Sequence, residues 1–310
     1  MKLVIVVPAW NEEEALPRTL AELPKRLDGF DTVETIVVDD GSVDRTSDVA
    51  RAGGALVERL PRHHGLAHAF TSGLSAALRN GADVVVNTDA DGQYDPAAIP
   101  ALVAPILAGE ADIVLGDRGV ATLSHFSPTK RWLQRLGAWL VRVLSGVPLR
   151  DATTGFRAFT RPAAARLNCH TTFTYTLETL IQAGQAGLAV RSVPVATRAT
   201  SRPSRLFRSN LGYVAISVAT LLRLVFIYRP LRALLALAGL CWLAALALVA
   251  RFAYYYLSGI SPAGHVQSLI AAAVLGLAGV QLAVLAVLAD LTAVNRRLLD
   301  ELRAREREKG

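Results

Sequence analysis

The sequence predicts an α/β chain. We expect a domain with a doubly wound, mostly parallel sheet, followed by an interfacial helix and a two-helix transmembrane hairpin. Three observations predict this class. Short apolar runs alternate with helix-like segments over roughly the first two thirds of the chain. Polar, turn-forming motifs directly follow several of these runs. Two long uncharged apolar runs occupy the C-terminal third.

The expected strands are short aliphatic or β-branched runs. They lie at residues 3–7, 35–38, 55–60, 84–87 and 113–115. Apolar residues recur with helical spacing in the segments between them, as in residues 12–27 and 66–79. Alternation of this kind favours parallel strands with helices on both faces, and such sheets bind ligands at the carboxyl ends of their strands.

The composition excludes several classes of protein. The chain has 310 residues, of which 52% are hydrophobic, and a formal net charge of +7. It is too apolar for a disordered chain and lacks the glycine or cysteine content of a collagen-like or disulfide-stapled fold. Its two cysteines, Cys169 and Cys241, lie in different parts of the chain, so we expect a reducing compartment. No nucleic-acid-binding motif accompanies the charge, which favours anionic lipid or phosphorylated substrates as partners and no nucleic acid.

The two apolar runs predict membrane spans. Ala233–Ala250 is an uncharged run of 18 residues, and Ser268–Ala289 is one of 22. At about 1.5 Å per residue each approaches or reaches the roughly 30 Å of a bilayer core. We expect spans at about 232–252 and 267–290, joined by a loop rich in turn residues. The alternative is a pair of buried helices in a soluble protein.

The distribution of cations predicts the orientation of the hairpin. The cations that flank its two ends are Arg223, Arg229, Arg232, Arg296, Arg297, Arg303, Arg305, Arg307 and Lys309. The connecting loop has only Arg251 and His265, so the domain and both termini should face the cytoplasm at the cell membrane. The expected segments are a catalytic domain at 1–204, an interfacial amphipathic helix at 205–229, the hairpin at 230–295 and a charged cytosolic tail at 296–310.

The most informative polar motif runs from Asp89 to Gln93. Two carboxylates at i and i+2 of an extended stretch project to one side, and hard oxygen ligands suit Mg²⁺ or Mn²⁺, which in turn binds a diphosphate. Taken alone, such a triplet is equally well explained as a solvated turn. The phosphate-binding motifs GxxxxGK[ST] and GxGxxG are absent. His63, His64 and His68 could suggest a metal site, since His64 and His68 have i, i+4 spacing, but no Cys or third ligand lies nearby, which disfavours it.

Four motifs together carry a resemblance to a known family. They are residues 6–13 (VVPAWNEE), 36–46 (IVVDDGSVDRT), 87–94 (NTDADGQY) and 151–159 (DATTGFRAF). In this order they resemble the inverting family 2 glycosyltransferases with a GT-A fold, and most closely the branch of dolichol-phosphate mannose synthases and polyprenyl-phosphate glucosyltransferases. The resemblance covers roughly residues 2–206. The QxxRW motif of processive synthases is absent, which implies transfer of a single sugar.

The resemblance implies a role for each matching residue. The donor nucleotide would contact Pro8, Trp10, Glu12, Asp39, Asp89 and Ala90. The metal would be held by Asp91 and Gln93, and the catalytic roles would fall to Asp91, Arg118, Arg131 and Arg157. The acceptor phosphate would be bound by Lys130, Arg131, Arg202 and Arg205. Here Arg202 and Pro203 replace the family's glycine, so the acceptor side departs most from the pattern.

The implied reaction moves one hexose from a nucleotide sugar to a polyprenyl phosphate with inversion. GDP-mannose is the favoured donor and UDP-glucose a close second. A phosphate monoester has a second pKa of about 6, so the acceptor is already largely ionised at neutral pH and needs no dedicated base. Two alternatives stay open: transfer to a glycolipid or polysaccharide hydroxyl, and a non-catalytic membrane scaffold. Small residues such as Gly276 and Gly279 would allow a homo-oligomer.

Overall fold

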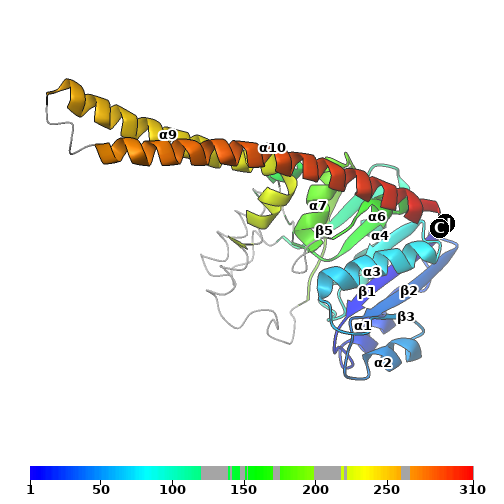
Figure 1. The fold of residues 1–310 in the computed structure, drawn as a ribbon. Helices are drawn as coiled ribbons and strands as arrows, with labels where there is room; N and C mark the ends of the chain where they lie inside the picture. Colours follow the sequence, from blue (N-terminus) through cyan, green and yellow to red (C-terminus); the bar gives the residue numbers. More distant parts are fainter. Residues whose placement is uncertain are drawn as a thin grey trace. The chain divides into compact units, whose positions relative to one another are not determined.

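The chain forms two units in its computed structural model, which describes residues 1–119, 139, 142–146, 151, 153–169, 175–198, 218–219, 222–259 and 266–309. The first unit comprises residues 1–220 with 300–310, and the second comprises residues 221–299 (Figure 1). Four predicted site residues, Lys130, Arg131, Arg202 and Arg205, lie outside the described residues. Each unit is considered by itself below.

The first unit is built on a seven-stranded mixed sheet with the order β3-β2-β1-β4-β6-β5-β7. The strands are β1 (Lys2–Ala9), β2 (Thr32–Asp39), β3 (Leu56–Arg59), β4 (Val84–Asn87), β5 (Ile113–Asp117), β6 (Arg157–Thr160) and β7 (Val190–Pro194). Every neighbouring pair is parallel except the two pairs that β6 makes with β4 and β5. The predicted α/β class with a mostly parallel sheet is therefore confirmed, as are all five predicted strands.

The sequence prediction missed β6 and β7. Strand β6 is only four residues long, and its first residue is a fully buried arginine that pairs with Asn87 of β4. Strand β7 is an edge strand with several exposed side chains. Neither has the continuous apolar run that marks a buried parallel strand, so neighbouring strands decide their conformation.

Helices cover both faces of this sheet (Figure 1). Alternate side chains of each central strand point to opposite faces, so both faces are apolar and both are buried under helices. Val4 and Val6 of β1 belong to one core, whereas Leu3, Ile5 and Val7 belong to the other. The covering helices are α1 (Leu16–Glu22), α2 (Thr46–Ala52), α3 (Leu66–Arg79), η1 (Pro96–Ala98), α4 (Ile99–Leu107), α6 (Arg161–Arg166) and α7 (Tyr175–Gln185). Helix α3 has the predicted bounds and approaches the sheet closely, since a Cβ at Gly73 would lie 2.3 Å from Val6 Cγ1.

Helix α1 is much shorter than the predicted segment 12–27. Its start is delayed because Asn11 has a positive φ of 53° and the Glu12 backbone donates to Thr46 Oγ1, at the start of α2. Its end is set by Pro24, which holds the preceding Leu23 in an extended conformation with a ψ of 138°. The apolar periodicity of residues 12–27 could not predict either the Asn11 conformation or the effect of Pro24.

Among the described residues, two helices are long and apolar enough to cross a membrane. They are α9 (Pro230–Leu257) and α10 (Val266–Lys309), of which residues 266–299 belong to the second unit. The predicted spans at 232–252 and 267–290 lie within them. A short helical stretch at residues 222–228 precedes α9, and Arg229 between them is not helical. The side chain of Arg296 donates to the Ile227 carbonyl at 2.8 Å and so caps that stretch.

Within this unit the small residues of α10 pack against an aromatic residue of α9. Trp242 Nε1 donates to the Gly276 carbonyl at 3.3 Å. A Cβ at Gly279 would lie 2.3 Å from the same nitrogen. Gly276 and Gly279, which the sequence suggested for helix packing, therefore pack against Trp242 of the same chain.

Replacing Gly279 by leucine should separate the two helices of the hairpin, because the larger side chain would occupy the space of the Trp242 indole. We expect cysteines placed at facing positions of α9 and α10 to cross-link more slowly in this variant. Gly239→Leu is the matched control, since a Cβ at Gly239 would meet nothing within 4 Å. Equal cross-linking in both variants would contradict the packing.

The last residues of α10 belong by their contacts to the first unit. Arg307 Nη1 donates to the Leu167 carbonyl at 3.2 Å, Asn168 Nδ2 donates to Asp300 Oδ1 at 3.3 Å, and Ala304 is buried. The neighbouring Cys169 is a free thiol, and burial raises its pKa to about 12. A thiol with such a pKa is almost wholly protonated at neutral pH.

Cys169 should therefore resist alkylation in the folded protein. In a Cys241→Ser variant at pH 8, we expect iodoacetamide to modify Cys169 about two to three orders of magnitude more slowly than an exposed cysteine. Mass spectrometry of native and denatured samples measures the difference. Rapid stoichiometric labelling of the native sample would show that the pKa of this partly buried thiol is not raised.

Candidate active site

The predicted site motifs follow β1, β2, β4 and β5. These four strands run in the same direction, so their carboxyl ends meet at one edge of the sheet. The side chains at this edge form two groups. One group follows β1 and β2, and the other lies around the end of β4 and the start of β6.

The loops after β1 and β2 are joined by hydrogen bonds. Asn11 Oδ1 accepts from the Val43 backbone at 2.9 Å, and the Asn11 backbone donates to Ser42 Oγ at 2.9 Å. The backbone of Glu12 donates to Thr46 Oγ1 at 2.9 Å. Pro8 is buried within β1, whereas Trp10 beyond its end is 40% exposed. Of the predicted nucleotide contacts from β1, the Trp10 ring is thus the one that presents a broad apolar face.

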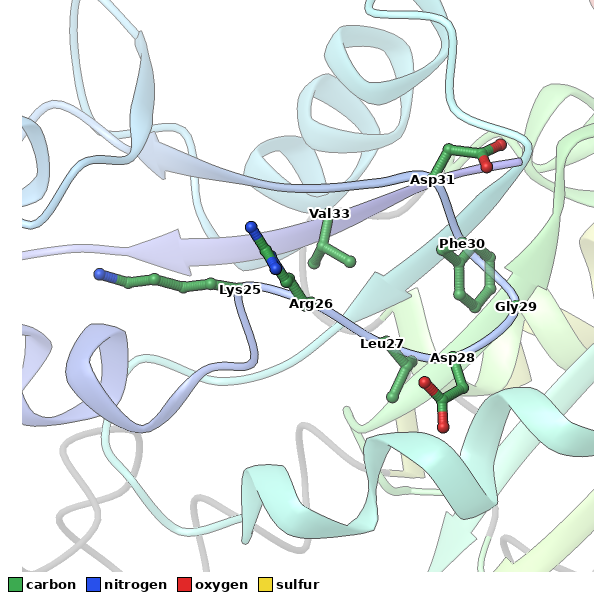
Figure 2. A pocket seen from close by; sticks show the side chains of 8 residues that line it. All are labelled: Lys25, Arg26, Leu27, Asp28, Gly29, Phe30, Asp31 and Val33. Carbon is green, nitrogen blue, oxygen red and sulfur yellow. The ribbon is translucent and has the colours of Figure 1, made fainter.

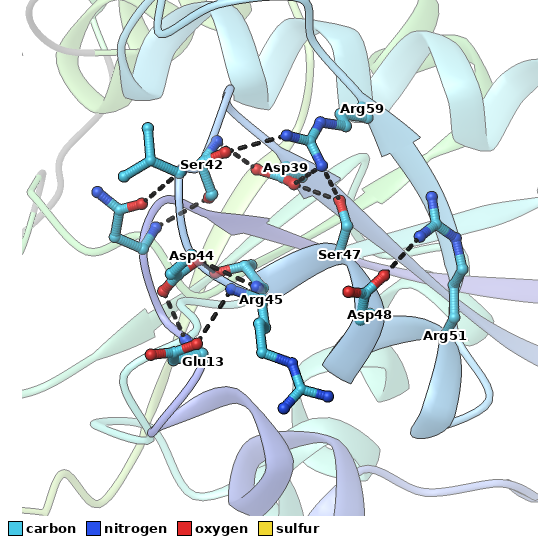
Figure 3. A network of polar contacts seen from close by, with 12 residues as sticks. Glu13, Asp39, Ser42, Asp44, Arg45, Ser47, Asp48, Arg51 and Arg59 are labelled. Carbon is cyan, nitrogen blue, oxygen red and sulfur yellow. Dashed lines mark hydrogen bonds and ion pairs between the residues drawn. The ribbon is translucent and has the colours of Figure 1, made fainter.

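The carboxylate of Asp39 lies at the centre of a polar network (Figure 3). Asp39 is fully buried, and its oxygens accept from the Ser42 backbone at 2.8 Å and from the Ser47 hydroxyl. Arg59 Nη1 lies 3.8 Å from Asp39 Oδ2. The structure therefore shows Asp39 holding the loop from Ser42 to Ser47, with no exposed surface of its own.

The Asp89–Gln93 turn follows β4. Ala90 is buried and its carbonyl accepts from Thr19 Oγ1 at 2.9 Å. Asp91 is exposed and accepts from the Gln93 backbone at 3.0 Å through Oδ1. Gln93 is half-buried, and its carbonyl accepts from the Arg198 backbone at 2.9 Å. The turn is thus held at Ala90 and at Gln93, and the Asp91 carboxylate between them is exposed to solvent.

Asp89 lies deeper in the second group and keeps some solvent exposure. Burial, followed by the nearby negative charge of Asp91, raises the pKa of Asp89 to about 7, although Arg118 and Arg157 act in the opposite direction. The backbone of Gly155 passes close by: a Cβ there would lie 2.8 Å from Asp89 Oδ1 and 2.8 Å from the Tyr175 hydroxyl. Asp89 is therefore crowded by protein on one side and repelled by Asp91 on the other.

Arg118, which was predicted to face the phosphates, is held by Asp151. Its Nε donates to Asp151 Oδ2 at 2.8 Å and its Nη2 donates to Asp151 Oδ1 at 3.1 Å. Nη2 also donates to Thr153 Oγ1 at 2.8 Å. This bidentate pair raises the pKa of Arg118 and lowers that of Asp151, in each case against the opposing effect of burial. The pair fixes the start of the 151–159 motif beside the end of β5.

Arg157 is fully buried at the start of β6. Its Nε donates to the Thr154 carbonyl at 2.8 Å and its Nη1 donates to Thr179 Oγ1 at 2.7 Å. The guanidinium carbon lies 5.9 Å from the centre of the Tyr175 ring. In this conformation Arg157 supports the Thr154–Gly155 backbone from within the protein and presents no surface to a ligand.

Several residues of this group were not singled out from the sequence, although they lie in or next to its motifs. Asn87 Nδ2 donates to the Gly155 carbonyl at 2.8 Å and to the Tyr175 hydroxyl at 3.2 Å. Tyr94 accepts from the Gly155 backbone at 3.1 Å through its hydroxyl and stacks on Phe156. The sequence offered one signal for them, because Asn87, Tyr94 and Gly155 lie inside the 87–94 and 151–159 motifs.

The second group fits a divalent cation. Asp89 and Asp91 supply hard carboxylate oxygens, their mutual repulsion would be relieved by a cation, and Gln93 adds an amide oxygen nearby in sequence. Among the described residues there is no group of three or more His, Cys, Asp or Glu side chains able to hold a metal by themselves. Such a donor set suits Mg²⁺ or Mn²⁺ that shares its coordination with a ligand and water.

An open pocket of about 620 Å³ lies away from this edge (Figure 2). It is lined by residues 25–31 and Val33, at the amino end of β2. The motifs described above follow the carboxyl ends of the strands, at the opposite edge of the sheet. We therefore assign the pocket no part in the site.

Comparison with known proteins identifies related sequences. The pattern described as "Glycosyl transferase family 2" matches residues 4–167. An undecaprenyl-phosphate mannosyltransferase of Micrococcus luteus is 32% identical over 51% of this chain and 66% of its own length. A dolichyl-phosphate hexose transferase of Haloferax volcanii is 32% identical over 66% of this chain and 86% of its own length.

A solved structure shares the fold. It is a glucosyl-3-phosphoglycerate synthase of Mycobacterium tuberculosis in complex with Mn²⁺, UDP-glucose and phosphoglyceric acid. The two chains superpose with a TM-score of 0.57 and 26% identity, over 72% of this chain and 78% of the other. The seven-stranded α/β unit is thus the GT-A fold that the motifs implied.

Proposed function

The chain belongs to glycosyltransferase family 2, and on that basis we propose that it transfers a single hexose from a nucleotide-diphosphate sugar to a polyprenyl phosphate with inversion. The supporting observation is the pair of carboxylates at Asp89 and Asp91, at the carboxyl edge of the sheet and beside the Arg118–Asp151 pair. A purely structural turn has no need for two like charges, one of them buried enough to raise its pKa.

Each side chain of the site then has a proposed role. Pro8, Trp10, Glu12 and Asp39 would form the nucleoside side, with Asp39 acting through the loop that it holds. Asp89 and Ala90 would lie near the ribose and phosphates. Asp91 and Gln93 would hold Mg²⁺ or Mn²⁺, which when bound neutralises negative charge on a diphosphate.

The arginines would contribute positive potential and rigidity. Arg118 is mostly buried, with 17% of its side chain exposed. Its positive charge lowers the pKa of Asp89, against the larger effect of burial. Arg157 would act as a positioning residue for the Thr154–Gly155 backbone. Lys130, Arg131, Arg202 and Arg205 stay predictions for binding the acceptor phosphate.

A lipid acceptor agrees with the two apolar helices. A polyprenyl tail leaves a bilayer only at a large cost in hydrophobic free energy, so an enzyme that uses it gains from being anchored there. The names of the two relatives, an undecaprenyl-phosphate mannosyltransferase and a dolichyl-phosphate hexose transferase, point to the same class of acceptor. The proposed orientation has the catalytic unit and both termini in the cytoplasm, at the cell membrane.

The test is sugar transfer by the purified, detergent-solubilised chain. Labelled GDP-mannose and UDP-glucose are offered separately with Mn²⁺ and a polyprenyl phosphate, and label in the organic phase is measured, with EDTA as control. We expect lipid-soluble label from one donor, lost with EDTA. Phosphoglyceric acid serves as a second acceptor, since the solved relative binds it, and its water-soluble product is measured by chromatography of the aqueous phase. Label transferred only to that acceptor, or to none, would contradict the proposal.

A further inference from the structure

The loop after β3 places an imidazole ring against Trp10. The ring centroids of Trp10 and His63 lie 4.2 Å apart with an interplanar angle of 24°, which is a stacked arrangement. Trp10 is 40% exposed and the His63 side chain is 48% exposed. One face of the indole is thus backed by His63 while the pair as a whole stays open to solvent.

A buried carboxylate fixes the position of His63. Asp40 is only 2% exposed, and its Oδ2 lies 2.8 Å from His63 Nδ1. The same carboxylate accepts from the backbones of His64 and Gly65, both at 2.8 Å. Asp40 therefore contacts three consecutive residues, and its Oδ2 lies beside the Nδ1 side of the imidazole.

The backbone of this loop lies close to the turn that follows β2. Gly41 has a positive φ of 68°, and a Cβ there would lie 2.4 Å from the carbonyl carbon of Arg62. The chain between Arg62 and Gly65 is therefore packed directly on the turn that follows β2. The contacts run from Asp40 to His63 and from His63 to Trp10.

We infer that His63 is a positioning residue for donor recognition: it fixes the Trp10 ring as a stacking platform for the base of the nucleotide. The platform lies beyond the carboxyl ends of β1, β2 and β3, where a doubly wound sheet binds nucleotides. An exposed, pre-oriented aromatic ring loses little entropy on stacking with a base. The inference rests on the proposed function and adds to it a residue that the sequence motifs do not mark.

The test separates donor binding from turnover in the full-length, solubilised protein. GDP and UDP binding in the presence of Mn²⁺ is measured by calorimetry, and donor KM and kcat by transfer. We expect His63→Ala to weaken nucleotide binding and raise donor KM by about fivefold to tenfold with kcat unchanged. His63→Phe keeps an aromatic ring against Trp10 and should restore binding to within about twofold. His68→Ala, which changes an exposed histidine on α3 without contact to Trp10, is the matched control.

The other outcomes are distinguishable. If the unmodified protein binds nucleotide and His63→Ala binds it equally well, the inference is wrong and the proposed function stands. Equal weakening in His63→Ala and His63→Phe, with a lowered melting temperature in both, would show a merely structural role and overturn it. If the unmodified protein binds neither nucleotide, the proposed function fails and the inference fails with it.

Discussion

Asp91→Asn should lower sugar transfer by at least about 100-fold, equivalent to about 2.7 kcal/mol of transition-state stabilisation. The change removes the carboxylate proposed to hold the cation together with Gln93, while an amide of nearly the same shape keeps the turn. Asp91 is exposed and its side chain bonds only to the Gln93 backbone among the contacts described, so the fold should survive. The measurement is turnover over a range of Mn²⁺ concentrations.

Asp28→Asn is the control for this prediction. It makes the same chemical change at an exposed residue near the amino end of β2, at the opposite edge of the sheet. We expect its turnover and its dependence on Mn²⁺ to match those of the unmodified protein. Normal metal-dependent turnover in Asp91→Asn would remove Asp91 from the proposed cation site.

Gly155→Ala should reduce transfer about 10-fold to 100-fold. The added Cβ would lie 2.8 Å from both the Asp89 carboxylate and the Tyr175 hydroxyl, so at least one must move. Tyr175 is buried and bonded to Asn87, which makes Asp89 the group more easily displaced. We also expect a loss of about 1–3 kcal/mol in the free energy of unfolding, as for other overpacked sites. Transfer assays and denaturant unfolding measure the two effects.

A double variant tests the geometric cause. Tyr175→Phe removes the hydroxyl that the new Cβ would meet, so Gly155→Ala with Tyr175→Phe should recover part of the lost activity. Tyr175→Phe alone serves as the reference, because it also loses the bond from Asn87. If the double variant lost activity as the simple sum of the two single changes, a clash between residues 155 and 175 would not be the cause.

Much of the fold was predictable because its elements have strong local signals. Residues 84–86 are three consecutive valines that follow turn residues, and helix α3 has an amphipathic pattern over its whole length. The two long apolar helices follow from length and composition. Strand β6 was not predictable, because a four-residue segment that starts with arginine becomes a strand only through its pairing with β4 and β5.

The candidate site was predictable in position but not in contacts. The sequence correctly placed Asp39, Asp89 and Asp91 at the ends of strands that share one edge. The proposal that Arg118 and Arg157 lie near ligand phosphates stays a prediction. Nothing in the sequence indicated that the first pairs with Asp151, 33 residues away, or that the second is buried against Thr179. An arginine finds its partner in three dimensions, and spacing along the chain does not encode that partner.

The sequence by itself determined the alternation of strands and helices, the edge at which the motifs gather and the apolar hairpin, because these depend on local periodicity and on the direction of parallel strands. Only the tertiary structure decided that Asp89 is crowded by Gly155, that Arg118 is locked to Asp151 and that His63 stacks on Trp10. The physical reason is that burial, electrostatic pairing and ring stacking depend on atoms a few ångströms apart in space and many residues apart in the chain.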